Sequence, residues 1–283
     1  MSDRESAAYG PIQEEDYREA ACPLCMDAPV DRPAQTVPQG RIMEKLDEYM
    51  AHRDLAGAER HLLYWLQEAQ ILGDERGELL VRGELMGHYR KAQKREEAME
   101  QTDAAFRLIA RLGMEGTVSE ATVCVNAATV YDAFGDPGRA IPYFERARAI
   151  YEASLPENDG RLGGLYNNMG LALAEERRFG EAYEAFQRAL RIADAREGSA
   201  LERAMTELNI ANAVEAEHGL ERGAEKIEQC LDIAQAQLDR EDVARDGYYA
   251  FVCEKCAPTF SYYGYFAFAE ELNERAEKIY AGT

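Results

Sequence analysis

The chain repeats one pattern of small and bulky apolar residues about every 42 residues, and this period limits what it can fold into. In the clearest copy, Leu165, Met169 and Leu173 are four residues apart, so they share one face of a helix. A second apolar face follows the break at Gly180 and comprises Ala182, Phe186 and Ala189. Two helices joined by a short turn cannot bury both faces alone, whereas stacked copies can.

Further copies of the unit lie on both sides of this one. The upstream copies have matching residues at Cys124, Ala127, Tyr131, Ala140, Phe144 and Ala147, then at Leu85, Tyr89, Ala98 and Ala105, and then at Leu46, Ala58 and Leu62. The downstream copies have them at Ile210, Val214, Ala224 and Leu231, shifted by about one residue, and at Cys253, Phe260, Ala269 and Ala276. The pattern predicts an all-α solenoid of about six helix pairs between residues 39 and 281.

The best copy resembles the tetratricopeptide repeat in its residues Tyr166, Met169, Gly170, Leu173, Ala182, Phe186 and Ala189. The family period is about 34 residues. The longer period here is similar to the kinesin-light-chain-like variety of the repeat. The resemblance implies a right-handed superhelix of helix-turn-helix units, and a concave face on which the first helix of each unit binds a protein or peptide segment.

Local chemistry agrees with short turns between helices. Asp136 can cap a helix that begins at Pro137, where the missing N–H of proline costs little. Ala140, Ala182 and Ala224 are small at the positions where neighbouring helices should cross closely.

Residues 1–38 differ from the remainder because they contain five of the nine prolines. Proline at this density removes helix hydrogen bonds. The sequence therefore predicts a proline-rich extended tail over 1–38 and a solenoid over 39–283.

Asparagines recur at one phase of the first helices and are the main candidates for ligand binding. Asn126, Asn168 and Asn209 form this series, and Asn167 and Asn212 lie beside it. A carboxamide offers a donor and an acceptor, as an extended peptide backbone requires. Alternatively, these side chains satisfy helix-end or interhelical groups. The other positions expected on the concave face are Arg90, Lys91, Thr122, Val125, Thr129, Asp132, Leu171, Glu175, Leu208 and Glu215.

Two CxxC pairs, Cys22 with Cys25 and Cys253 with Cys256, are candidate metal ligands. Four thiolates could hold zinc, although the pairs are far apart in the chain. The alternative function is therefore a zinc-binding or redox-responsive regulatory protein. Cys253 also aligns with Cys124 at a core position, so the second pair has a purely structural alternative.

Charge and composition narrow the partners. The net charge is −21, with 53 acidic and 32 basic residues, which disfavours nucleic acid and anionic membranes and favours basic or apolar peptides. No apolar run reaches membrane-spanning length and no secretion signal is recognisable, so a cytoplasmic protein is expected.

Catalytic motifs are not recognisable, and we expect neither an enzyme nor a required cofactor. The four histidines lack the spacing of a zinc protease, and there is no glycine-rich phosphate loop. An aromatic-rich stretch, residues 248–268, is expected either to seal the end of the solenoid or to mediate a homodimer.

Overall fold

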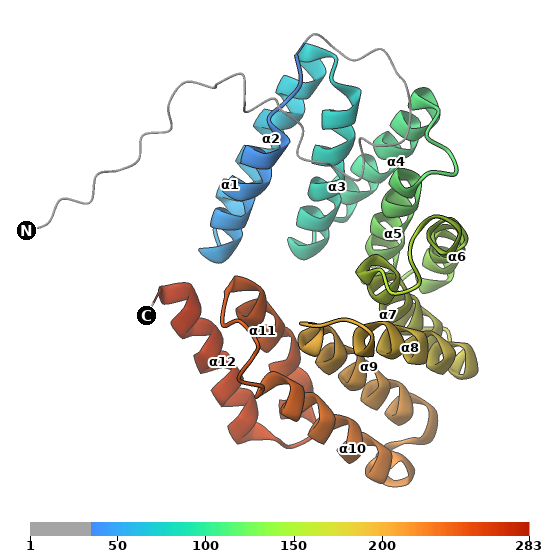
Figure 1. The fold of residues 1–283 in the computed structure, drawn as a ribbon, viewed down its shortest axis with the longest axis vertical. Coiled ribbons are helices and arrows are strands. Elements are labelled where there is room, and N and C mark those ends of the chain that lie inside the picture. The colour runs from blue at the N-terminus through green and yellow to red at the C-terminus, as the bar shows by residue number, and fades with distance from the viewer. Residues whose placement is uncertain (1–34, 283) are drawn as a thin grey trace, which may run out of the picture.

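The computed structural model describes residues 35–282, and over this range the chain is built from twelve α-helices. Consecutive helices pack as six antiparallel pairs, α1 with α2 through α11 with α12 (Figure 1). The predicted all-α fold of six helix pairs is confirmed. The helices are α1 (Gln39–Ala51), α2 (Leu55–Leu72), α3 (Glu75–Lys91), α4 (Arg95–Leu112), α5 (Val118–Ala133), α6 (Pro137–Ser154), α7 (Gly160–Glu175), α8 (Phe179–Asp194), α9 (Ala200–His218), α10 (Leu220–Leu238), α11 (Gly247–Tyr262) and α12 (Phe266–Ala281).

The turn within each pair has a repeated construction. One residue takes a left-handed conformation, and the next N–H bonds to the carbonyl five residues earlier, which closes the end of the first helix. In the α5–α6 turn, Gly135 has a φ of 76° and the Asp136 N–H bonds to the Tyr131 carbonyl at 3.0 Å. The predicted cap is confirmed, since the Asp136 carboxylate accepts from the Arg139 N–H at 3.3 Å. The same left-handed position is occupied in four other pairs by Arg53, Gln93, Arg177 and Gly264.

Small residues stand where the two helices of a pair cross, as the repeat predicts for Ala140 and Ala182, which are both fully buried. The prediction for Ala224 is wrong, because this side chain is exposed. Gly223 takes its place, and a Cβ added there would lie 2.9 Å from Val214. The cause is the tight α9–α10 connection through Gly219 alone, which shifts the fifth pair by one residue.

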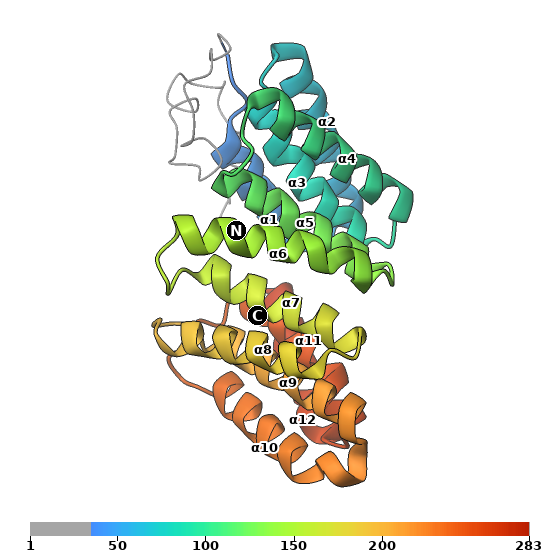
Figure 2. The same cartoon turned by 90° about the vertical axis from the view of Figure 1, so that its right-hand side faces the viewer.

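The odd-numbered helices form one continuous layer: α3 contacts α5, α5 contacts α7, α7 contacts α9, and α9 contacts α11. This layer lies toward the inside of a curved molecule, with α4, α6, α8 and α10 outside it (Figures 1 and 2). The order follows from the repeat, because each first helix packs on the first helix of the next unit.

The curve brings the two ends of the solenoid together (Figure 1). Arg53, in the α1–α2 turn, forms an ion pair with Glu254 of α11. Its guanidinium also lies 4.5 Å from the centre of the Tyr280 ring in α12. Nearby, the Lys91 ammonium lies 5.3 Å from the centre of the Phe251 ring. The repeat pattern contains no signal for this contact, because it joins residues about 200 apart in sequence.

Candidate functional site

The candidate site is the inner face of the curved layer, which we define by the partly or fully exposed residues of α3, α5, α7 and α9. These recur every three or four residues between buried neighbours, as on one side of a helix. Three glycines leave parts of this face uncovered, and a Cβ added at Gly87 or Gly164 would touch nothing within 4 Å. The inner face comprises Gly83, Gly87, Arg90, Asn126, Thr129, Asp132, Gly164, Asn167, Asn168, Leu171, Glu175, Met205, Asn209 and Asn212.

The asparagines divide into two groups. Asn209 donates to the Asn167 carboxamide oxygen at 2.9 Å, so this pair ties α9 to α7. Asn126 and Asn168 are only partly buried, and their carboxamides have no hydrogen-bond partner within residues 35–282. The interhelical alternative therefore describes Asn167 and Asn209, while Asn126 and Asn168 keep their donors and acceptors available.

Other predicted residues have different surroundings. The Thr129 hydroxyl donates to the Asn126 backbone carbonyl at 2.9 Å, so it lies flat along α5. Asn212 lies farther along the face, where its carboxamide oxygen accepts from the Tyr263 hydroxyl at 3.1 Å. Two other expectations for the inner face are wrong: Leu208 is buried, and the Thr122 hydroxyl lies 2.8 Å from that of Tyr151 in α6. Adjacent helix positions differ by about 100° in direction, so a small phase error turns a side chain toward the outer layer.

A charged cluster formed by Arg90, Asp132 and Glu175 lies at the ends of α3, α5 and α7. Burial raises the pKa of Asp132 to about 7, and the neighbouring Glu175 raises it further while Arg90 opposes the change. One Asp132 carboxylate oxygen and the Arg90 Nε are buried, and neither has a hydrogen-bond partner in the described part of the chain. The sequence placed these residues on the concave face but did not indicate that they interact.

The Asp132→Asn substitution should stabilise the protein above neutral pH. The folded-state pKa of Asp132, about 7, exceeds its ordinary value of 3.8, so the folded state binds more protons between these values and loses stability as pH rises. At pH 8 the variant should gain about 1–2 kcal/mol, a value reduced because the side chain keeps some solvent access. Urea unfolding at pH 8 and pH 4 would test this, since the gain must shrink toward pH 4.

The predicted metal ligands do not form a site within the described residues. Cys253 and Cys256 are buried in α11, and burial raises the pKa of both thiols, that of Cys256 to about 12. The thiolate that binds metal is therefore disfavoured at both positions. Residues 35–282 contain no group of three or more His, Cys, Asp or Glu residues placed to hold a metal ion. Cys22 and Cys25 lie outside the described residues, and their zinc or redox role stays a prediction.

The aromatic stretch of the last helix pair serves two environments. Tyr249, Phe260 and Phe268 are buried and close the end of the core. By contrast, Tyr262 and Phe266 are 64% and 69% exposed. A homodimer through this surface stays a prediction.

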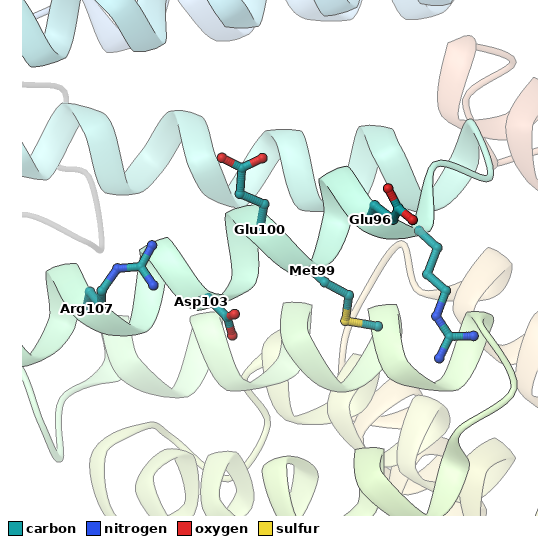
Figure 3. Close-up of a pocket in the computed structure, with 6 residues that line it drawn as sticks. Glu96, Met99, Glu100, Asp103 and Arg107 are labelled. Atoms are coloured by element: carbon teal, nitrogen blue, oxygen red, sulfur yellow. The ribbon is translucent and has the colours of Figure 1, made fainter.

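A depression of about 590 Å³ lies on the outer helix α4, away from the inner face (Figure 3). All its lining residues come from this one helix, including Glu96, Met99, Glu100, Asp103 and Arg107. Met99 and Glu100 point to opposite sides of α4, so the groups do not converge on one point (Figure 3). A ligand site normally gathers polar groups from several elements, and the inner face meets that condition better.

Comparison with known proteins agrees with this architecture. Residues 164–196, which span α7 and α8, match the family model of the tetratricopeptide repeat. BtubC (BKLC) from P. vanneervenii has a similar structure, with a TM-score of 0.60 and 23% identity over 71% of this chain and 79% of that one. A variant of a Podosopora anserina protein with nearly identical, kinesin-light-chain TPR-like repeats gives a TM-score of 0.50 and 21% identity over 72% and 95% of the two chains.

A Rap protein complexed with Competence and Sporulation Factor is also similar, with a TM-score of 0.55 and 16% identity. The match covers 84% of this chain and 62% of the Rap protein. A search of curated protein sequences found no significant match.

The fold and the inner face define an α-solenoid of paired helices. It is a tetratricopeptide-repeat solenoid with structural similarity to kinesin-light-chain-like repeat proteins, which confirms the resemblance found in the sequence. None of the helices in residues 35–282 has the length and apolar character needed to span a membrane.

Proposed function

We propose that this chain is a non-catalytic binding protein that holds an extended segment of another polypeptide along its inner face. The observation that carries the proposal is the set of polar groups left unpartnered there, namely the Asn126 and Asn168 carboxamides, the Arg90 Nε and an Asp132 carboxylate oxygen. Buried polar groups normally have partners, so a recurring row without them is suited to a ligand that supplies donors and acceptors at intervals.

Charge and shape indicate the kind of segment. With a net charge of −21, the chain should attract a basic or apolar segment in preference to an acidic one. The glycines of the inner face allow a ligand backbone to approach the helices closely. The Rap structure contains a bound factor, and its similar fold supports this use of a solenoid.

The Gly164→Leu substitution tests the proposal directly. Its side chain would extend into open space, so the fold should be retained, and replacing a helical glycine should add about 0.5–1 kcal/mol of stability. We expect peptides selected by the native protein from a random nonapeptide pool to bind the variant at least tenfold more weakly. Nine extended residues reach about 30 Å and span several repeats.

The matched control is Gly180→Leu, because Gly180 is also a helical glycine with open space but lies on the outer helix α8. Thermal unfolding would verify that both variants fold, and calorimetry would measure binding. The proposal fails if the native protein selects no peptide, or if Gly164→Leu binds the selected peptides as tightly as Gly180→Leu does.

A further inference from the structure

Three charged residues occupy equivalent positions in successive repeats on the inner face. Arg90, Asp132 and Glu175 are each in the last turn of their helices, α3, α5 and α7, and are separated by 42 and 43 residues. Because these helices contact one another in succession, the three side chains belong to one continuous patch. Electrostatic coupling of Asp132 to both Arg90 and Glu175 shows that the groups are close.

The two carboxylates are placed against the usual rule for helix ends. The carbonyl groups of a last turn carry partial negative charge, which favours a cation there and disfavours an anion. Arg90 follows this rule, whereas Asp132 and Glu175 do not. Such a placement needs an additional positive charge to offset it.

The surrounding elements do not supply this charge. Arg90 forms no ion pair with Asp132 within 4 Å, and neither Asp132 nor Glu175 has another cationic partner in the described chain. On the paired helix α6, the Arg139 guanidinium lies instead over the Tyr131 ring, 4.2 Å from its centre. Lys91, beside Arg90, lies over Phe251 of α11.

We propose that Asp132 and Glu175 together bind a cationic group of the ligand, either a lysine or arginine side chain or a free amino terminus. This inference rests on the proposed function, since the cation would be carried by the segment bound along the inner face. Arg90 Nε is then positioned to donate to a backbone carbonyl of the same segment. Asn126 lies just under two helical turns before Asp132 and can contact the adjoining part of the ligand backbone.

The titration of Asp132 gives the subsite a pH signature. Its pKa of about 7 means that a large fraction of the group is protonated near neutral pH in the absence of ligand. A bound cation favours the ionised form, so binding should release a proton and should strengthen between pH 6 and pH 8. A purely structural role for Asp132 predicts neither change.

The test uses four pools of nonapeptides. Three pools have blocked ends, random flanks and a central lysine, norleucine or glutamate, and the fourth has central norleucine with a free amino terminus. We expect the lysine pool, the free-amine pool or both to bind the native protein at least tenfold more tightly than blocked norleucine, by calorimetry at pH 8. The preference should fall below about twofold in Asp132→Asn and in Glu175→Gln. It should persist in Glu176→Gln, because Glu176 lies beside Gly138 of α6.

The outcomes separate the two proposals. If all four pools bind with equal affinity, or if the preference survives in both Asp132→Asn and Glu175→Gln, the cation subsite is wrong while peptide binding stands. If no pool binds, the proposed function fails and the subsite fails with it.

Discussion

Replacing Phe186 by alanine should lower the free energy of unfolding by about 3–5 kcal/mol. Phe186 is fully buried in α8, near the middle of the solenoid. Its ring fills the space above Gly170 of α7, where an added Cβ would lie only 2.5 Å from the ring. Alanine would therefore leave a cavity at the centre of the α7–α8 pair, and glycine on the facing helix offers no side chain to fill it.

The position of Phe186 determines how far the damage should spread. Each pair in a solenoid is stabilised by its neighbours, so weakening a central pair removes support from both sides. We expect faster amide hydrogen exchange from α5 through α10, together with a lower urea midpoint. Phe179→Ala is the matched control, because Phe179 is a partly exposed phenylalanine at the start of the same helix. An equal loss for both variants would show that the Phe186 contact is not special.

The sequence was sufficient for the fold because the residues that determine it recur locally. Ala140 and Ala182 mark the helix crossings, and Phe144 and Phe186 fill the space beside them, so a single period predicts every pair between them. The period fails where a connection shortens, as at Gly219, and the small residue moves from Ala224 to Gly223. The contact of Arg53 with Glu254 could not be predicted, because it depends on curvature accumulated over all six pairs.

The inner face was less predictable than the fold. The repeat placed Asn126 and Asn168 correctly on the exposed side of their helices. It could not show that Asn167 and Asn209 bond to each other, because this requires the relative rotation of α7 and α9. The spacing of Asp132 and Glu175 was visible in the sequence, but their missing partners became evident only from the packing around them.

Replacing Tyr249 by alanine should detach the last helix pair from the rest of the solenoid. Tyr249 is fully buried in α11, and its hydroxyl donates to the Leu238 carbonyl at the end of α10 at 3.1 Å. The same hydroxyl accepts from Arg275 of α12 at 2.9 Å, and the Arg245 guanidinium lies 4.0 Å from the ring centre. One side chain thus joins three segments, and its removal should cost about 3–5 kcal/mol.

This loss should stay local, in contrast to that of Phe186→Ala, because a terminal pair has a neighbour on one side only. Hydrogen exchange should accelerate in α11 and α12 while α3 through α8 stay protected. The ion pair of Arg53 with Glu254 is half-exposed at Arg53 and is worth about 1 kcal/mol at most, so it cannot hold the pair in place. Tyr248→Ala is the control, since Tyr248 is 46% exposed at the adjacent position. Accelerated exchange throughout the chain in Tyr249→Ala would contradict this account, because it would mean that the closed ends make the solenoid unfold as one unit.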